Sequence, residues 1–238
     1  MTTAADKSLT LTIFGASGAT GRAAIKAARR NNHKVRAVDH HLPEQSEDDP
    51  MIEHVQADVL KDDLREHVRG ADAVLSCLGV GNAPETLLDP PPLYTDGTAA
   101  ICKAMEAEAV KRLIVISATF VETRDRGPIW FKLPAMAGLH LVFEQMKQME
   151  QNLHQHKGLD WTAVRPGWLM EGPLTEDYVV QADVIPKDLI RTRHADLGHF
   201  MVSLAETDAW VHQTPAIARD EPAHTTSPLA VLDEIVGG

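Results

Sequence analysis

The sequence predicts an α/β fold in which a doubly wound parallel sheet carries helices on both of its faces. Short apolar runs alternate with amphipathic stretches, a glycine-rich turn follows the first apolar run, and no internal repeat or linker interrupts the order. Strands that alternate with helices form βαβ units, which build parallel sheets. Because 238 residues suffice for one domain with a full core, we expect a single domain over 1–238.

Each element is expected where the residue pattern changes. Strands are expected in the apolar runs 9–14, 34–38, 52–58, 71–79, 112–117 and 161–166. Helices are expected where apolar residues recur at helical spacing, in 20–32, 62–68, 95–110, 140–156 and 193–206. The connection 119–139 is expected to be irregular, and the pattern fades after Arg165, with a short final helix in 227–238. We therefore expect substrate-side additions at 119–139 and 166–238, the latter forming a small C-terminal substrate region.

The overall charge and the cysteine content exclude several classes of protein. A net charge of -11 would repel the phosphate backbone, so no nucleic-acid partner is expected. No apolar run is long enough to span a bilayer, and the polar N-terminus lacks a signal-peptide core. Cys77 and Cys102 lie in apolar segments and are expected to be reduced core thiols, typical of a cytoplasmic protein. The twelve histidines show no metal-ligand spacing, so no metal site is expected.

The stretch GASGATGR carries three glycines, each three positions after the last. It follows a predicted strand and opens a predicted helix, which is the context in which such a motif indicates a dinucleotide site. Gly15 would form the tight turn, Gly18 would let the backbone approach a pyrophosphate, and Gly21 would let helix and strand pack closely. The helix N-terminus offers unpaired N–H groups to the phosphates. The other residues expected to contact the cofactor here are Ser17, Ala19, Thr20 and Arg22.

The motif and several later segments resemble the atypical short-chain dehydrogenases/reductases. The matching segments are GASGATGR (15–22), ADV (57–59), LG (78–79), VISA (115–118), GLDWTAVRPGW (158–168) and DLGHFM (196–201). The late pair PLTEDY (173–178) and DLGHFM is similar to the biliverdin-IXβ reductase/flavin reductase branch. This resemblance implies a Rossmann-like fold and an NAD(P)H-dependent reductase, whose substrate site lies over the carboxyl ends of the strands.

Asp39 is the residue expected to determine whether the protein prefers NAD or NADP. An acid at the end of the second strand accepts hydrogen bonds from the adenosine ribose and repels a 2′-phosphate, which favours NAD. The resemblance implies NADP, yet the next position carries His40 where the resembled reductases often have arginine. Arg22, Arg36 or a protonated His40 are alternative partners for a 2′-phosphate. The resemblance also places four further residues near the adenosine: Asp58, Val59, Leu78 and Gly79.

The catalytic pair of the wider superfamily is incomplete. Its Tyr-x-x-x-Lys spacing here has Phe143 in place of the tyrosine and keeps Lys147. Phenylalanine cannot pass a proton, so interconversion of ordinary alcohols and ketones through this pair is not expected. Lys147 is interpreted either as a group that holds the nicotinamide ribose or as a solvated helix lysine.

The ends of the later strands supply the expected substrate region. A hydroxyl at this strand end points into the ligand crevice. The resemblance implies that Ser117 contacts the nicotinamide amide or the substrate, or orients a proton-donating water, and the alternative is that Ser117 simply closes its strand. Pro166 and Gly167 would turn the chain over the nicotinamide, and Trp168 would either stack on a planar substrate or join the core. The other residues expected at the substrate are Trp130 and Phe131 in a substrate lid, and the cations Arg165 and Arg193.

Two functions fit these residues. The first is an oxidoreductase that passes hydride from NAD(P)H to a planar acceptor such as a flavin, a quinone or a tetrapyrrole. The second is a dinucleotide sensor without catalysis, similar to the nitrogen-metabolite-repressor type. A sugar-nucleotide epimerase is disfavoured by the absent tyrosine and the small C-terminal portion. The partner is expected to be a small molecule, and the chain a monomer or a homodimer.

Overall fold

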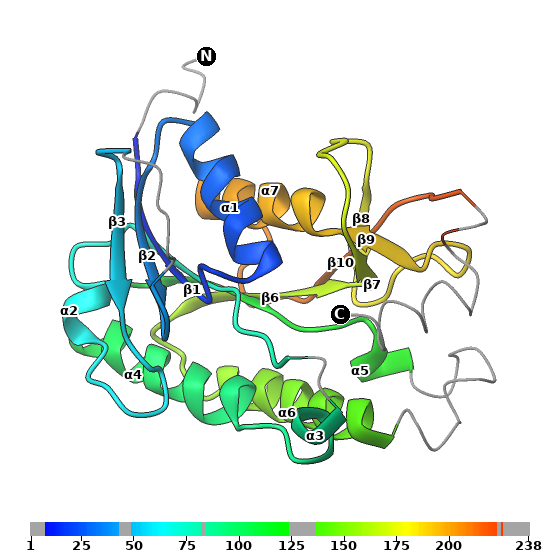
Figure 1. Cartoon of the computed structure of the whole chain (residues 1–238), viewed down its shortest axis with the longest axis horizontal. Coiled ribbons are helices and arrows are strands. Elements are labelled where there is room, and N and C mark those ends of the chain that lie inside the picture. Colours follow the sequence, from blue (N-terminus) through cyan, green and yellow to red (C-terminus); the bar gives the residue numbers. More distant parts are fainter. Residues whose placement is uncertain (1–7, 43–48, 82–83, 124–136, 223–224, 226–238) are drawn as a thin grey trace.

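An eight-stranded, mostly parallel sheet forms the centre of the molecule in a computed structural model, which describes residues 8–42, 49–81, 84–123, 137–222 and 225 (Figure 1). The strands are β1 (Thr10–Phe14), β2 (Lys34–Asp39), β3 (Ile52–Gln56), β4 (Ala73–Ser76), β5 (Arg112–Ile116), β6 (Asp160–Pro166), β7 (Trp168–Met170), β8 (Val179–Ala182), β9 (Arg191–Arg193) and β10 (Pro215–Ala218). The sheet order is β3-β2-β1-β4-β5-β6-β10-β8, and only the β10–β8 pair is antiparallel. β7 and β9 pair separately.

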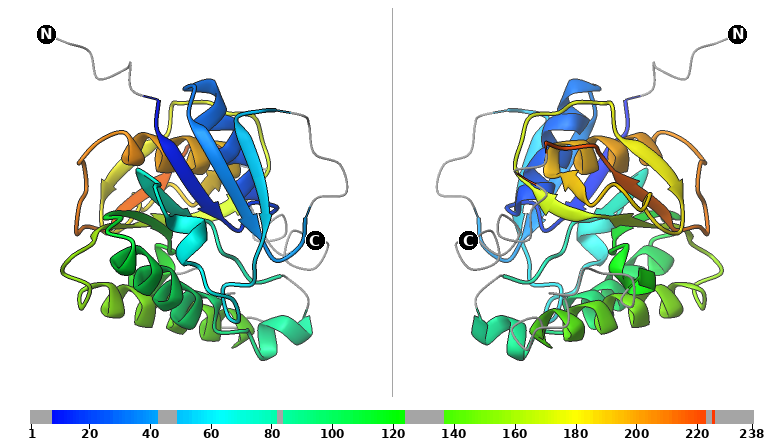
Figure 2. Two further views of the ribbon diagram at one scale, coloured as in Figure 1. Left: turned by 90° about the vertical axis from the view of Figure 1, so that its left-hand side faces the viewer. Right: turned by 90° about the vertical axis from the view of Figure 1, so that its right-hand side faces the viewer.

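Helices cover both faces of this sheet, as Figures 1 and 2 show. They are α1 (Ala19–Arg30), α2 (Arg65–Val68), α3 (Pro84–Leu88), the π-helical turn η1 (Leu93–Gly97), α4 (Thr98–Ala107), α5 (Phe120–Thr123), α6 (Ala137–Leu153) and α7 (His194–Ala205). One face packs against α1 and α7, and the other against α2, α4 and α6. Because both faces are covered, β4 and β5 are buried along their whole length, which explains why each is apolar except for one end residue, Ser76 and Arg112.

The α/β class and the doubly wound parallel sheet are confirmed, and the differences concern individual elements along the chain. The predicted helix over 95–110 is shorter and is preceded by η1. The connection predicted to be irregular over 119–139 begins with α5 and ends inside α6. Four short strands, β7 to β10, follow Arg165, where the sequence pattern predicts none. These strands have three or four residues each, too few for a periodicity to be recognised. The tail 227–238 lies outside the described residues.

Candidate dinucleotide site

The sheet order reverses beside β1, because β2 and β3 lie on one side of it and β4, β5 and β6 on the other. Ligands of open α/β sheets bind at the carboxyl ends of the strands at such a switch point. A cleft of about 770 Å³ opens here. The predicted cofactor residues that line it are Gly15, Ser17, Gly18, Ala19, Thr20, Asp39, His40, Asp58, Val59, Leu78, Gly79, Ser117, Pro166, Gly167 and Trp168.

The glycine-rich turn between β1 and α1 forms the floor of one end of the cleft. Gly15 has φ +72°, and a Cβ there would lie 2.5 Å from the carbonyl oxygen of Cys77. A Cβ on Gly21 would lie 2.0 Å from the carbonyl oxygen of Gly15, so this glycine allows the helix to pack on the turn. Gly18 caps α1 and borders the cleft, with more room than the other two. Gly15 and Gly21 are thus required by the close packing of the turn, and Gly18 leaves space beside the cleft.

The N-terminus of α1 is suited to an anionic group. No side chain caps it, and its first turn contains no acidic residue, so its backbone N–H groups and its partial positive charge are available. Thr20 lines the cleft, and its hydroxyl lies 2.7 Å from Nδ1 of His194, which also lines the cleft. Arg22 does not line it and instead hydrogen-bonds the carbonyl oxygen of Ser17. The sequence offered no signal for His194, because only the packing of α7 on α1 brings it here.

Asp39 ends β2 at the same edge of the cleft, and 8% of its surface is exposed. Ser17 donates its backbone N–H and its hydroxyl to one carboxylate oxygen, at 2.9 and 2.8 Å. His40 Nδ1 lies 2.7 Å from the other oxygen. Burial opposes ionisation of Asp39, but the hydrogen bonds from Ser17, His41 and His40 outweigh it and lower the pKa of this carboxyl. The cleft therefore presents a full negative charge at neutral pH.

The middle of the cleft is mostly apolar, and a buried tyrosine lines it. Tyr94 of η1 is 6% exposed. Burial raises its pKa to about 12, although a hydrogen bond with the backbone of Val80 acts in the opposite direction. Asp58 borders the cleft and pairs with Lys61 at 2.7 Å, and the hydrogen bond from that ammonium lowers the pKa of Asp58.

An aromatic wall lies at the far end of the cleft, next to Ser117. The rings of Phe120 and Phe143 have centroids 5.5 Å apart, and those of Phe120 and Trp168 are 5.8 Å apart. A Cβ on Gly167 would lie 2.6 Å from the carbonyl oxygen of Ile190, so only glycine lets the chain turn tightly before Trp168. Trp168 lines the cleft and also packs against the core, and its stacking on a planar substrate stays a prediction. Sequence reasoning missed Phe120 and treated Phe143 only as a lost tyrosine.

Ser117 borders the cleft, but its hydroxyl is hydrogen-bonded to a residue that does not line the cleft. It donates to Oε1 of Glu150 on α6 at 2.6 Å, and Ser117 is 1% exposed. Arg165 donates to both oxygens of the same carboxylate, at 2.9 and 2.6 Å. Arg165 also contacts Glu122 at 3.3 Å and donates to the backbone oxygen of Asp183. Arg165, which was predicted to contact the substrate, is therefore bonded to other residues of the chain, and it does not line the cleft.

A second cavity of about 440 Å³ lies behind this group, and the structure places Lys147 there. Phe143 and Met146 of α6 border the cleft. Lys147 and Glu150 of the same helix border the second cavity instead. Lys147 is exposed and does not line the cleft, so the structure does not bring it together with the predicted cofactor residues. Of the two interpretations, this position is that of a solvated helix lysine.

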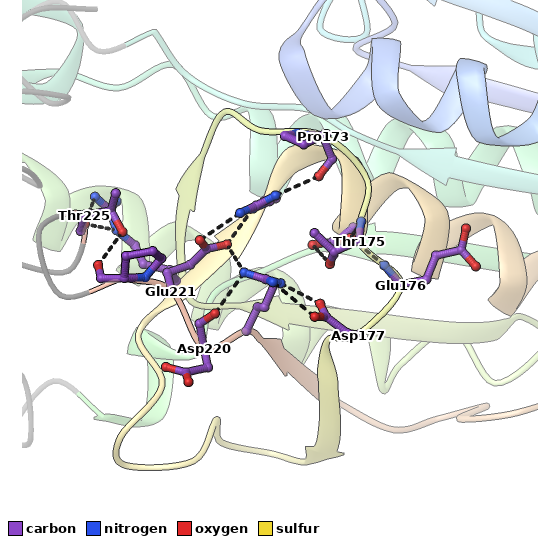
Figure 3. A network of polar contacts seen from close by, with 12 residues as sticks. Pro173, Thr175, Glu176, Asp177, Asp220, Glu221 and Thr225 are labelled. Carbon is purple, nitrogen blue, oxygen red and sulfur yellow. Dashed lines mark hydrogen bonds and ion pairs between the residues drawn. The ribbon is translucent and has the colours of Figure 1, made fainter.

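Arg193 is also separated from the cleft, in contrast to its predicted role. It donates to both carboxylate oxygens of Glu221 and to the carbonyl oxygen of Pro173. Figure 3 labels these two acceptors within the surrounding polar network. Glu221 pairs in addition with Arg219, which bonds Asp177. This network fastens the chain after β10 to the segment before α7, so Arg193 acts as a structural cation. The predicted lid residues Trp130 and Phe131 lie outside the described residues.

A family model described as NAD(P)H-binding matches residues 15–208 of the chain. The match begins at the first glycine of the turn and includes every strand from β2 to β9. The chain belongs to this NAD(P)H-binding family. The predicted Rossmann-type dinucleotide fold is thereby confirmed, in agreement with the resemblance to atypical short-chain dehydrogenases/reductases.

Solved structures share the fold at low sequence identity. The oxidoreductase ylbE from Lactococcus lactis is 20% identical, with a TM-score of 0.73 over 94% of this chain and 96% of its own. A protein described as a candidate NADH-flavin reductase, from Streptococcus pneumoniae, is 19% identical, with a TM-score of 0.70 over 89% and 100%. A candidate NAD-dependent epimerase/dehydratase from Bacillus halodurans is 18% identical, with a TM-score of 0.70 over 95% and 99%. At this identity, these similarities establish the fold alone.

In the part of the chain that the structure describes, no helix combines the length and the apolar character needed to cross a membrane. Within the same residues, no cluster of three or more histidine, cysteine or acidic side chains could hold a metal ion. Cys77 and Cys102 are buried free thiols, and burial raises the pKa of each to about 12, so neither is a reactive thiolate at neutral pH.

Proposed function

We propose that the protein is an NAD(P)H-dependent oxidoreductase that reduces a planar acceptor such as a flavin, a quinone or a tetrapyrrole. The observation that carries the proposal is the continuity of one cleft from the glycine turn to the aromatic wall of Phe120, Phe143 and Trp168. A dinucleotide held by its pyrophosphate at α1 can place its nicotinamide near Ser117, where an aromatic wall favours a flat second ligand.

The side chains available at this end of the cleft favour hydride transfer without a strong general acid. The chain contains two tyrosines, Tyr94 and Tyr178, and neither occupies the position of Phe143. The raised pKa of buried Tyr94 makes it a weak proton donor. When bound, NAD(P)H would supply a hydride to the acceptor. The apolar residues of the wall would shield the transferred hydride from water and favour a flat ring. A conjugated acceptor spreads the incoming charge, so it can wait to take a proton until its edge meets solvent at the mouth of the cleft.

The residues around Asp39 favour NADH over NADPH within this proposal. The carboxylate is ionised and lies where the adenosine ribose is expected, so a 2′-phosphate would meet a like charge. Arg22, one of the alternative cations, is turned toward Ser17. Arg36, the other, is bonded to Glu53 and to backbone oxygens near His67. His40 remains at the rim, paired with Asp39.

A comparison of acceptors tests the proposed function. Oxidation of NADH and NADPH is followed by absorbance with a flavin, with a short-chain quinone and with a simple ketone. We expect turnover with the flavin or the quinone and none with the ketone, because reduction of a ketone needs a proton donor at the position of Phe143. Tight dinucleotide binding without turnover of any acceptor would instead support the sensor function.

A further inference from the structure

We propose that Glu150 is a positioning residue, which holds the Ser117 hydroxyl so that it can only accept hydrogen bonds from the cleft, where its partner is the carboxamide N–H of the nicotinamide. The inference deepens the proposed function and rests on a dinucleotide in the cleft. It identifies a group that sequence reasoning did not consider, because Glu150 belongs to a different element from Ser117 and does not line the cleft.

The first step of the argument is the position of these three side chains. Ser117 borders the cleft, whereas Glu150 and Arg165 border the second cavity, so together they form the partition between the two spaces. Only 8% of the Glu150 side chain and 6% of that of Arg165 is exposed. A buried carboxylate of this kind needs a fixed cationic partner, and Arg165 supplies one with two hydrogen bonds.

The second step concerns the direction of the hydrogen bonds. Arg165 can only donate, so both oxygens of Glu150 act as acceptors toward it. The contact of 2.6 Å between Ser117 and Glu150 must then use the single hydroxyl hydrogen of Ser117. What Ser117 presents toward the cleft is therefore oxygen lone pairs.

The third step is the consequence for the ligand. A carbonyl oxygen opposite Ser117 would meet an oxygen that cannot donate, whereas an N–H would be paired. The nicotinamide carboxamide carries both groups, so Ser117 would select the orientation in which the amide nitrogen faces β5. Replacement of this carboxamide by an acetyl group removes both N–H donors and leaves the ring and the carbonyl unchanged, which makes the substitution a direct probe.

The test compares two ligands by isothermal titration calorimetry: NAD⁺ or NADP⁺, whichever binds more tightly, and its 3-acetylpyridine analogue. The wild-type protein should bind the analogue about ten-fold more weakly, because the Ser117 acceptor is left unpaired. Ser117→Ala should bind the two within about two-fold. Glu150→Gln should also reduce the discrimination, because a glutamine amide can donate to Ser117 and release its hydrogen toward the cleft. Gln148→Ala, an exposed position on the same helix, is the matched control and should keep the wild-type ratio.

Different failures have different meanings. Equal affinities of the wild-type protein for the two ligands would overturn the role of Ser117 as an acceptor while leaving the proposed function intact. Persistent discrimination in Ser117→Ala would do the same. Absence of binding by either dinucleotide would overturn the proposed function itself. Ser117→Ala removes one oxygen and keeps the Glu150–Arg165 pair, so its result stands even where Glu150→Gln does not fold.

Discussion

The backbone conformation of Gly18 does not by itself require glycine. Its φ of -66° and ψ of 161° are open to any residue, and an added Cβ would lie 3.3 Å from the nearest atom, the carbonyl oxygen of Gly15. A side chain there would point at the space expected for the pyrophosphate. We expect Gly18→Val to lower dinucleotide affinity at least about 100-fold while the free energy of unfolding changes by about 1 kcal/mol or less.

Calorimetric titration and urea unfolding measure the two quantities. Gly21→Ala is the informative comparison, because its Cβ would lie 2.0 Å from the carbonyl oxygen of Gly15. That variant should lose stability as well as binding. Normal affinity in Gly18→Val would mean that the glycine-rich turn is only a turn.

Asp39 allows an isosteric test of cofactor choice. An asparagine at this position can keep an oxygen toward both Ser17 donors and turn its amide toward His40. It loses only the longer hydrogen bond from the backbone N–H of His41, so most of the local geometry should survive. We expect wild-type protein to bind NADH about ten-fold more tightly than NADPH, and Asp39→Asn to lose most of that preference. Fluorescence titration of both reduced cofactors gives the ratio. A clear preference of the wild-type protein for NADPH would contradict the assignment of Asp39.

At the scale of elements, the site depends on how closely α7 packs against α1. A Cβ on Gly198 would lie 2.6 Å from the backbone nitrogen of Ala24, so the two helices touch through their backbones. This contact explains the glycine of the DLGHFM segment, and it brings His194, the first residue of α7, to Thr20 at the start of α1. The helix that covers one face of the sheet therefore also contributes a residue to the end of the cleft beside α1.

Gly198→Ala tests this packing. The added methyl group must push backbone aside, so we expect the free energy of unfolding to fall by about 1–3 kcal/mol. Urea unfolding followed by circular dichroism measures the change. Gly158→Ala is the matched control, because nothing lies within 4 Å of its Cβ position, and it should leave the stability unchanged or slightly higher. Equal stability of the two variants would show that α7 can shift away from α1 without cost.

At the scale of the whole molecule, paired carboxylates determine how stability depends on pH. The hydrogen bond from Arg219 lowers the pKa of Asp177 to about 2. Hydrogen bonds from Arg193, with a smaller one from Arg219, also lower the pKa of Glu221, while burial acts in the opposite direction. A carboxyl group with a lower pKa in the folded state stabilises the protein above its unfolded pKa, and this contribution is lost as the pH falls through the folded value.

We therefore expect the free energy of unfolding to be nearly constant from pH 7 to pH 5 and to fall between about pH 4.5 and pH 2. Urea midpoints at successive pH values measure the curve. Asp177→Asn should flatten the part between about pH 4 and pH 2, because its side chain no longer takes up a proton on unfolding. An unchanged slope in that variant would mean that Asp177 has the same pKa in both states.

The sequence by itself determined the class of fold and predicted where one end of the cleft lies. Gly15, Gly18, Gly21 and Asp39 could be placed there because their spacing follows from one local unit, a strand, a turn and a helix, whose geometry hardly depends on the rest of the chain. Tertiary structure alone decided the far end. His194 reaches the cleft by helix packing, and Glu150 reaches Ser117 from another element. Long side chains such as Arg165 and Arg193 bind whichever partners the fold brings near, and no spacing in the sequence records those partners.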